Sequence, residues 1–281
     1  MIAQFRKWDN DTRITIAQVY IVYTITFIIS IIDLGTLYPQ FNVMWVFIVY
    51  ILLLLLSLIC HYKCVVTSNA VPEYIKMDMT TYKPCDKCGF GKPERTHHCS
   101  KCKECVLCMD HHCLYIANCV GFNNKKYFIL LLLYNTLMSS FVVFINSPLA
   151  VYAFLYPEVG PMYDKVFRFF DLIHFGAALY SFVLVFQTAP YMLSAVFCNL
   201  TTIDLIIKGS SGLLSSHQSQ IRNKYDLGVK KNITQIFGND GVLAFFPTKP
   251  KGLTSDGITF EHNTVYSHSL DEQYNEYYED Y

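Results

Sequence analysis

Long stretches without a charged side chain constrain the fold of this chain more than any other feature. No Asp, Glu, Lys or Arg occurs in residues 14–32, 35–60, 127–157 or 172–203. An α-helix of about 20 apolar residues crosses the hydrocarbon core of a bilayer. A buried helix in a soluble protein, the competing interpretation, is rarely uncharged on every face over such a length. The sequence therefore predicts an all-α polytopic membrane protein with four transmembrane helices.

The distribution of basic residues predicts the orientation of these helices. Of the 22 Lys and Arg residues, twenty lie in residues 1–13, 61–126 and 200–281. Cytoplasmic segments of membrane proteins carry an excess of Lys and Arg. We therefore expect a multi-pass protein whose two termini, and the segment between helices two and three, are cytosolic. The sequence does not choose between the endoplasmic reticulum, the Golgi and the plasma membrane. The net charge is zero, so nucleic acid is not an expected partner.

These patterns divide the chain into six expected parts. Lys125 and Lys126 are expected to mark the lipid headgroup boundary before the third helix, and Asn135 is expected to face the interior of the helix bundle. No internal repeat is expected. The parts are a cytosolic arm (1–13), transmembrane helices one and two (14–60), a cytosolic linker and Cys-rich domain (61–126), helices three and four (127–200), a membrane-associated C-terminal region (201–248) and a disordered tail (249–281).

The Cys-rich segment predicts metal binding. Eight of the eleven cysteines lie between residues 85 and 119, and clustered cysteines in a reducing cytosol indicate metal or catalysis rather than disulfides. Two-residue gaps between cysteines allow both sulfurs to reach one tetrahedral ion. A short polar segment also needs metal to supply its folding energy. Spacing alone predicts two structural Zn²⁺ sites without assigning ligands to each ion. The pattern is Cys85-x2-Cys88-x9-His98-Cys99-x2-Cys102-x2-Cys105, followed by His112 and Cys119.

Six cysteines and two histidines fill two such sites, which leaves Cys108 and Cys113 over. Cys108 follows Leu107 and is expected to be a packed apolar side chain. Cys113 follows Asp110-His111-His112. A thiol is a poor nucleophile at neutral pH until a base produces the thiolate; an imidazole can take the proton, and a carboxylate can orient the imidazole. Cys113, His111 and Asp110 are therefore a candidate nucleophile, base and orienting group. A third zinc ligand or an inert thiol is the alternative for Cys113.

The segment resembles the DHHC family of protein S-acyltransferases, or palmitoyltransferases, and the resemblance covers residues 14–240 approximately. Two weaker motifs also match in part. Thr201-Thr202-Ile203-Asp204 is similar to a Thr-Thr-x-Glu motif, and Asn232 with Phe237-Gly238 is similar to a C-terminal motif with a structural Asn. The matching residues of the main signature are Lys92-Pro93-x-Arg95-x-x-His98-Cys99, Cys102, Cys105, Asp110-His111-His112-Cys113, Asn118-Cys119-Val120-Gly121 and Asn124.

The resemblance implies a two-step reaction. Cys113 would take an acyl group from long-chain acyl-CoA, the acyl donor, and pass it to a cysteine of a membrane-associated substrate protein. His111 would act as general base and Asp110 would orient it. Two structural zinc ions would be held by Cys85, Cys88, His98 and Cys105, and by Cys99, Cys102, His112 and Cys119. Lys92, Arg95 and His97 would meet the phosphates of CoA, unless they form a plain solvated turn.

Two departures from the family pattern qualify this interpretation. The family commonly has Pro-Trp after the catalytic cysteine, whereas this chain has Leu114-Tyr115. Asp204 is one methylene shorter than the usual Glu and could weaken a tether to the Cys-rich domain. Met138 falls near the position that would close the acyl cavity.

Two other functions compete: a catalytically silent zinc-binding membrane scaffold, which shares every structural feature, and a RING-like ligase, which has no need of an unliganded cysteine.

Overall fold

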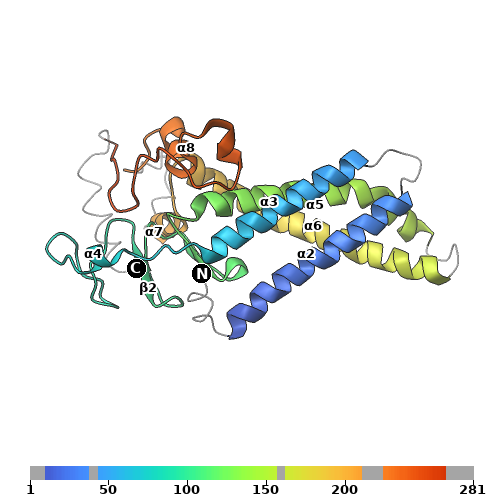
Figure 1. The fold of residues 1–281 in the computed structure, drawn as a ribbon, viewed down its shortest axis with the longest axis horizontal. Helices are drawn as coiled ribbons and strands as arrows, with labels where there is room; N and C mark the ends of the chain where they lie inside the picture. Colours follow the sequence, from blue (N-terminus) through green and yellow to red (C-terminus); the bar gives the residue numbers. More distant parts are fainter. Residues whose placement is uncertain (1–9, 38–43, 157–161, 211–223, 264–281) are drawn as a thin grey trace. The chain divides into compact units, whose positions relative to one another are not determined.

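The computed structural model describes residues 10–37, 44–156, 162–210 and 224–263 (Figure 1). The chain divides into two compact units. The first contains residues 1–62 and 130–189, and the second contains residues 63–129 and 190–281. Each unit takes two separate stretches of sequence, because the Cys-rich segment is inserted between long helices.

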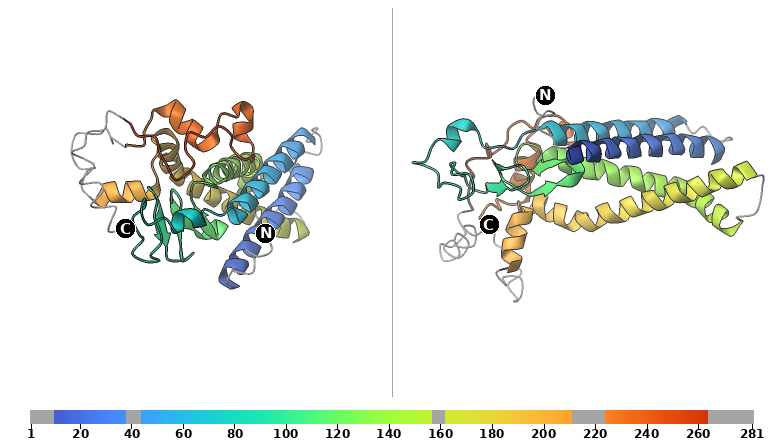
Figure 2. Two further views of the ribbon diagram at one scale, coloured as in Figure 1. Left: turned by 60° about the vertical axis from the view of Figure 1, so that its left-hand side comes forward. Right: turned by 90° about the horizontal axis from the view of Figure 1, so that it is seen from below.

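The first unit consists of long helices that run alongside one another (Figures 1 and 2). Three of the described helices have a stretch long and apolar enough to cross a membrane, at Asn10–Ser30, Trp45–Val66 and Lys125–Phe144. A shorter apolar stretch, Leu172–Thr188, lies in the fourth long helix. The structure therefore fits a membrane protein, and the four-helix count stays a prediction. The four helices are α2 (Asn10–Leu37), α3 (Met44–Val66), α5 (Lys125–Leu155) and α6 (Met162–Phe197).

A polar cluster lies among the apolar side chains of the first unit. The Tyr23 hydroxyl on α2 is 2.9 Å from the Ser57 hydroxyl on α3 and donates to Asn135 Oδ1 on α5 at 2.8 Å. The Ser57 hydroxyl donates to the same Asn135 oxygen at 2.6 Å. Met138 is buried one turn further along α5, with Tyr50 and other apolar side chains. Asn135 therefore faces the interior of the helix bundle, as its polarity predicts for a residue in hydrocarbon.

The second unit contains strands that the all-α prediction missed. Two antiparallel hairpins are formed, one by β1 (His97–Cys99) with β2 (Glu104–Val106) and one by β3 (His111–Cys113) with β4 (Asn118–Val120). Strands of three residues are too short to show an alternating apolar pattern, which is the signal that identifies strands in sequence. The unit also contains α4 (Glu73–Lys76), η1 (Leu114–Ile116), α7 (Thr202–Ser210), α8 (Val229–Phe237) and η2 (Gly241–Phe245).

The two hairpins belong to an internal repeat, and the expectation of no repeat is wrong. The pattern Cys-x2-Cys-x9-His-x6-Cys begins at Cys85 and begins again at Cys99, 14 residues later. Each hairpin places the repeat's His opposite its last Cys. The equivalent turn residues Lys103 and Ala117 are both left-handed, with φ of 57° and 47°. The repeat escapes notice in the sequence because its second copy starts before the first copy ends.

Lys125 and Lys126 were expected to mark the headgroup boundary, which stays a prediction, and the structure shows where their side chains lie. Their side chains are buried in the second unit, with relative exposures of 6% and 2%. The Lys126 ammonium group is 3.4 Å from the Leu243 carbonyl oxygen and 3.4 Å from the Thr248 hydroxyl. These lysines lie in the first turn of α5, close to backbone carbonyls of the C-terminal segment. The Lys126 ammonium group supplies a hydrogen-bond donor to one of these carbonyls.

The prediction of a disordered tail is wrong for residues 249–263, and residues 264–281 lie outside the described part. The Phe260 ring packs edge-on against Tyr225 at a centroid distance of 5.7 Å. His262 Nε2 is 3.0 Å from a carboxylate oxygen of Glu94. The backbone N–H of Asn239 donates to the backbone carbonyl of Lys251 at 2.8 Å. A mainly polar segment is ordered here because a few anchoring side chains bind it to the rest of the unit.

Gly238, at the end of α8, supports this segment and provides a test. Its φ is +73°, and a Cβ there would clash with the Lys251 carbonyl oxygen. We expect Gly238→Ala to lower the free energy of unfolding by about 2 kcal/mol or more, because it combines a disfavoured φ with a backbone clash. The measurement is the fraction of monodisperse protein that survives a heating series.

Gly89→Ala is the matched control, because Gly89 has the same φ of +73° and no atom lies within 4 Å of the place that a Cβ would take. The Gly89 variant should lose less stability than the Gly238 variant, since only the disfavoured φ applies. Equal losses would show that the approach of Lys251 is unimportant.

Candidate functional site

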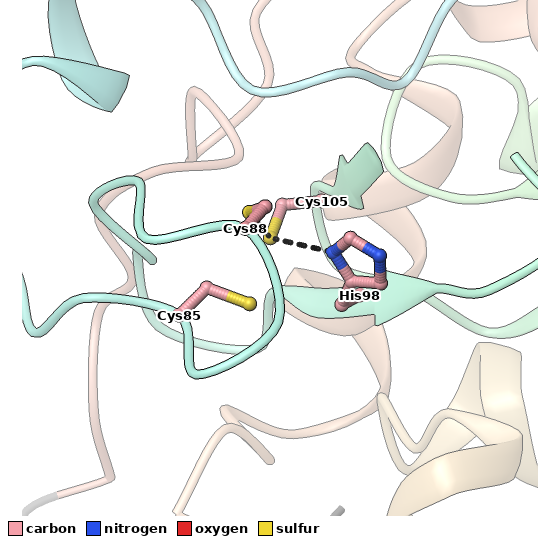
Figure 3. Close-up of side chains that lie close together, drawn as sticks. All are labelled: Cys85, Cys88, His98 and Cys105. Carbon is pink, nitrogen blue, oxygen red and sulfur yellow. Dashed lines mark hydrogen bonds between the residues drawn. The ribbon is translucent and has the colours of Figure 1, made fainter. Parts of the chain in front are cut away.

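The first candidate metal centre joins the loop before β1 to the first hairpin. Cys85 and Cys88 come from the loop, His98 from β1 and Cys105 from β2, and their side chains converge (Figure 3). All four ligand atoms lie within 4.8 Å of one another. Cys105 Sγ is 3.6 Å from Cys88 Sγ and 3.8 Å from His98 Nδ1.

The second candidate centre joins the turn of the first hairpin to the second hairpin. His112 Nδ1 is 3.6 Å from Cys99 Sγ, 3.4 Å from Cys102 Sγ and 3.6 Å from Cys119 Sγ. Three sulfurs and one nitrogen at these separations suit a closed tetrahedral site. The structure thus brings together the same two sets of four residues that the family resemblance implies, and each set could hold a metal ion.

Cys113 belongs to neither group among the described residues, and the repeat explains why. Cys85, Cys99 and Cys113 follow one another at intervals of 14 residues. The first two begin a metal site, and each has a second cysteine three positions later. Cys113 has Ile116 at that place, and the Ile116 side chain is fully buried. Cys113 therefore stands at the start of a third, incomplete copy, with a half-buried thiol and no paired cysteine.

His111 and Asp110 form an oriented pair beside this thiol. His111 Nδ1 is 2.8 Å from Asp110 Oδ2, and the His111 ring packs edge-on against Phe128 at 5.5 Å. Burial alone would lower the pKa of His111, but the hydrogen bond to Asp110 and the proximity of Cys113 raise that pKa to about 9. With a pKa of about 9 the imidazole is largely protonated near pH 7, and the Asp110 carboxylate opposes that charge. The pair thus has the geometry of a base held by a carboxylate.

Asp110 is held in place by groups from two helices, α7 and α5. The Thr202 hydroxyl on α7 donates to Asp110 Oδ2 at 2.6 Å, and the Thr202 amide donates to Oδ1 at 3.3 Å. The Lys125 ammonium group on α5 lies 3.7 Å from Oδ1. Burial would raise the pKa of Asp110, but the contacts with His111 and Lys125 hold it well below its usual range. Asp110 is therefore a buried carboxylate that cannot rotate away from His111.

Sequence reasoning missed Thr202 and Lys125 as partners of Asp110. Thr202 lies inside the quoted Thr-Thr-x-Asp motif, so the motif itself was the available signal, although it does not say which group the threonine binds. Lys125 carries no such signal, because a lysine at the start of an apolar helix resembles one that reaches lipid headgroups.

Arg95 occupies an internal ion pair. Its Nη2 atom is 2.8 Å from Asp204 Oδ2, and both side chains are almost fully buried. The guanidinium also donates to Asn199 Oδ1 at 3.0 Å and to the Asn199 carbonyl at 2.8 Å, and its Cζ lies 4.2 Å from the Tyr225 ring centroid. The shorter Asp204 thus still reaches the Cys-rich domain, and the positive charge of Arg95 is already opposed.

His97 is also buried, at 3% exposure. Burial and then the nearby Lys92 lower the pKa of His97 to about 4, so its ring is neutral at physiological pH. Of the three residues expected to meet CoA phosphates, only Lys92 has a side chain that is not buried. Phosphate contacts by Arg95 and His97 would require this packing to open.

Asn232 and Asn199 have structural roles that suit their burial. The Asn232 amide donates to the Phe197 carbonyl and to Asp226 Oδ1, both at 2.6 Å, and its oxygen accepts from the Leu227 amide at 3.0 Å. Both residues also begin Asn-x-Ser/Thr sequences, the acceptor pattern for N-glycosylation, and their buried, hydrogen-bonded side chains indicate chance matches to that pattern.

Comparison with known proteins adds independent evidence. Residues 78–209 match the family model described as DHHC palmitoyltransferase. The chain is 33% identical to probable protein S-acyltransferase 15 of Arabidopsis thaliana over 65% of this chain and 70% of that protein. It is 36% identical to probable protein S-acyltransferase 14 of the same plant, covering 56% of this chain and 47% of the relative. It is 31% identical to palmitoyltransferase ZDHHC15 of Xenopus laevis, and the match covers 69% of this chain and 54% of that protein. The chain thus spans about half the length of several of these relatives.

The ion pair between Arg95 and Asp204 leads to a stability prediction. Asp204→Asn keeps the shape of the side chain but leaves a buried guanidinium without its counter-charge. We expect the variant to lose about 3–5 kcal/mol of folding free energy. The measurement is the midpoint of thermal loss of monodisperse protein.

Glu261→Gln serves as the control, because the Lys231–Glu261 pair of 2.6 Å is about half exposed on both sides. Exposed pairs contribute about 1 kcal/mol or less. If the two substitutions shifted the midpoint equally, the buried pair would not be the tether described above.

Proposed function

The chain belongs to the DHHC palmitoyltransferase family, and from this premise we propose that it is a protein S-acyltransferase. It would move a long-chain fatty acyl group, typically palmitoyl, from acyl-CoA to cysteines of membrane-associated proteins. The observation that carries the proposal is the placement of Cys113. Its half-buried thiol lies in neither candidate metal group of the described residues, beside a histidine that Asp110 orients.

In the first step Cys113 forms the acyl-enzyme. His111 Nδ1 is engaged with Asp110, so Nε2 is the ring atom that holds the proton taken from the Cys113 thiol, and the reactive pair is an imidazolium beside a thiolate. The Cys113 sulfur bonds to the thioester carbonyl carbon, the bond from that carbon to the CoA sulfur breaks, and CoA leaves with the proton returned from His111. The buried Asp110 carboxylate stabilises the intermediate imidazolium. Because Thr202 and Lys125 hold Asp110, the ring stays oriented throughout.

In the second step a cysteine of the substrate protein repeats the exchange. Its thiol gives a proton to His111, its sulfur bonds to the acyl carbon, and the bond to Cys113 breaks. The Cys113 sulfur recovers a proton from His111, so the enzyme returns to its starting state. One base and one orienting carboxylate therefore serve both transfers.

We further propose that the two Cys3His groups hold structural zinc. Bound zinc would supply folding energy to a segment with a small apolar core. His112 and Cys119 face each other across the second hairpin, so anchoring them fixes the backbone on both sides of Cys113. The donor set agrees with zinc, since three thiolates and an imidazole are a common closed coordination sphere.

The proposed topology has four membrane-spanning helices, with α6 as the fourth, and a cytosolic Cys-rich domain. This places Cys113 where water-soluble CoA and a membrane-borne acyl chain can meet. Leu114, which replaces the family's usual proline, is 73% exposed next to the nucleophile, and an exposed apolar side chain suits a lipid-facing position. Lys92 remains the proposed phosphate contact. A catalytically silent scaffold has no specific observation in its favour.

The acyl-enzyme is tested by labelling purified protein with an alkyne-tagged palmitoyl-CoA. Wild type should take up label that hydroxylamine releases, because the link is a thioester to Cys113. Cys113→Ser should take up almost none, since its hydroxyl is a far weaker nucleophile. Cys108→Ser is the control and should label as wild type does, because Cys108 is buried at 4% exposure. Equal labelling of the Cys113 variant and wild type would reject the catalytic assignment.

The zinc proposal is tested by elemental analysis of the same purified proteins. Wild type and Cys113→Ser should each contain two zinc ions per chain, because Cys113 belongs to neither group. Cys99→Ala and His112→Ala should lose zinc and aggregate, since each removes a ligand of the second centre. Retention of two ions in both ligand variants would contradict the ligand set.

A further inference from the structure

A short segment late in the described chain packs on the Cys-rich domain. We name residues 255–263 the C-terminal strap, and they lie beyond residues 78–209, the part of the chain that matches the family model. The strap is braced within itself, because Asp256 Oδ1 accepts the backbone N–H groups of Ile258 and Thr259 at 2.9 and 2.8 Å. A braced loop of this kind can support the residues that it contacts.

The strap is anchored at both ends within the second unit. Near its start, the Gly257 backbone approaches Phe122 so closely that a Cβ would lie 2.6 Å from the ring. Ile258 packs on the apolar cluster around the first candidate metal centre. At its end, the backbone N–H of Asn263 donates to the Lys224 carbonyl at 2.7 Å. The strap therefore ties the segment that follows Lys224 to the Cys-rich domain.

Between these anchors the strap packs against Tyr225, a buried residue. The rings of Phe260 and His262 lie 5.7 and 5.6 Å from the Tyr225 ring, centroid to centroid, and both are close to perpendicular to it. His262 Nε2 is 3.0 Å from one oxygen of the Glu94 carboxylate. The Tyr225 hydroxyl donates to the other oxygen at 2.7 Å. Two ring contacts and one shared carboxylate thus fix Tyr225 against the strap.

The Tyr225 ring in turn supports Arg95. The guanidinium Cζ atom is 4.2 Å from the Tyr225 ring centroid and 5.4 Å from that of Phe260, and such packing favours one orientation of a guanidinium. Asn199, which accepts two hydrogen bonds from Arg95, also donates to the Tyr225 carbonyl at 2.8 Å. Tyr225, Arg95 and Asn199 therefore form one packed group, and Phe260 joins the strap to it.

This packed group fixes the start of α7. Arg95 Nη2 binds Asp204 Oδ2 at 2.8 Å, and the same oxygen accepts the Thr201 backbone N–H at 2.8 Å. The Thr201 hydroxyl accepts the Asp204 backbone N–H at 3.1 Å, so these two residues form a reciprocal cap at the helix N-terminus. Thr202 comes next, and both of its hydrogen bonds hold Asp110. The place of the Asp110 carboxylate thus depends on the group that the strap supports.

We propose that the C-terminal strap is a positioning element for acyl transfer, which acts through Tyr225, Arg95 and α7 on Asp110. The inference rests on the proposed function, because Asp110 matters there as the carboxylate that orients His111. Phe260 is a positioning residue in this account. Removing its ring loosens the start of α7, and a small displacement of a catalytic group slows a reaction strongly. The effect falls on the rate of acyl-enzyme formation and not on the affinity for acyl-CoA.

The test measures single-turnover formation of the acyl-enzyme by the purified full chain, over a series of concentrations of alkyne-tagged palmitoyl-CoA. The amplitude counts competent protein, and the rate constant reports on the site of that protein alone. Phe260→Ala should lower the maximal rate constant about tenfold, with the half-saturating concentration changed by less than about twofold. A merely structural role would lower the amplitude and leave the rate constant unchanged.

Two further substitutions at this position separate the ring from its bulk. Phe260→Tyr keeps a ring against Tyr225 and Arg95, so its rate constant should stay within about twofold of wild type. Phe260→Leu fills much of the same space without a ring face for the guanidinium. It should slow the reaction about threefold or more, and it decides the question if Phe260→Ala does not fold.

Glu261→Gln is the matched control, because Glu261 lies in the strap but pairs with the exposed Lys231. It should react at the wild-type rate. Thr202→Val tests the route, since it removes the hydroxyl that holds Asp110. If the strap acts through this hydroxyl, adding Phe260→Ala to Thr202→Val should slow the reaction by less than about twofold more.

A wild-type rate constant in every folded Phe260 variant would overturn the inference and leave the proposed function intact. Full additivity of Thr202→Val and Phe260→Ala would also overturn it, since the strap would then act by another route. A wild-type protein that takes up no hydroxylamine-sensitive label would overturn the proposed function, and this inference with it.

Discussion

Two interleaved sets of candidate metal ligands are the constraint on which the rest of the second unit depends. The hairpins have strands of three residues, which could not hold a register by apolar packing alone. Their register is set where His98 faces Cys105 and where His112 faces Cys119. Because the second set begins inside the first hairpin, at Cys99, the first hairpin carries ligands of both centres, and the second hairpin is tied to it through the second centre. Cys113 continues the strand that carries His112 and inherits this rigidity.

Helix α7 connects this rigid core to the charged groups that serve the chemistry. Thr202 binds Asp110, and two residues later Asp204 binds Arg95. One short helix thus holds both the Asp110 carboxylate and the buried ion pair with Arg95. Lys125 adds a positive charge near Asp110 from α5. A buried carboxylate with three partners keeps one orientation, which the proposed role of His111 in both transfers would require.

The sequence predicted the parts of the site that depend on local spacing. Pairs such as Cys85 and Cys88 are informative because cysteines separated by two residues can bind one ion. Cys113 stood out because the other cysteines and histidines were already enough to fill two metal sites. The family resemblance supplied the grouping of ligands, which spacing had left open. The three-residue strands and the interleaved repeat were missed because neither gives the periodic signal that reveals strands or tandem copies.

Other expectations rested on the type of a charged residue, without knowledge of its partner. Arg95 was expected to meet phosphates, yet Asp204, more than one hundred residues later, opposes its charge. Lys126 was expected to mark the headgroup boundary, and nothing in the sequence indicates that its side chain binds the carbonyl of Leu243. Contacts between positions so distant in sequence cannot be inferred from one sequence. The polar residues 249–263 were misjudged in the same way, because Phe260 and His262 find partners on Tyr225 and Glu94.

X-ray absorption at the zinc edge can decide whether the Cys113 thiol is free of metal, because it reports which atoms surround the ion. We expect an average of three sulfur ligands and one nitrogen ligand per zinc, as the two groups require, and an unchanged spectrum in Cys113→Ser. A wild-type average above three sulfurs that falls in Cys113→Ser would place the Cys113 thiolate on the metal. That result would contradict a free nucleophile beside His111.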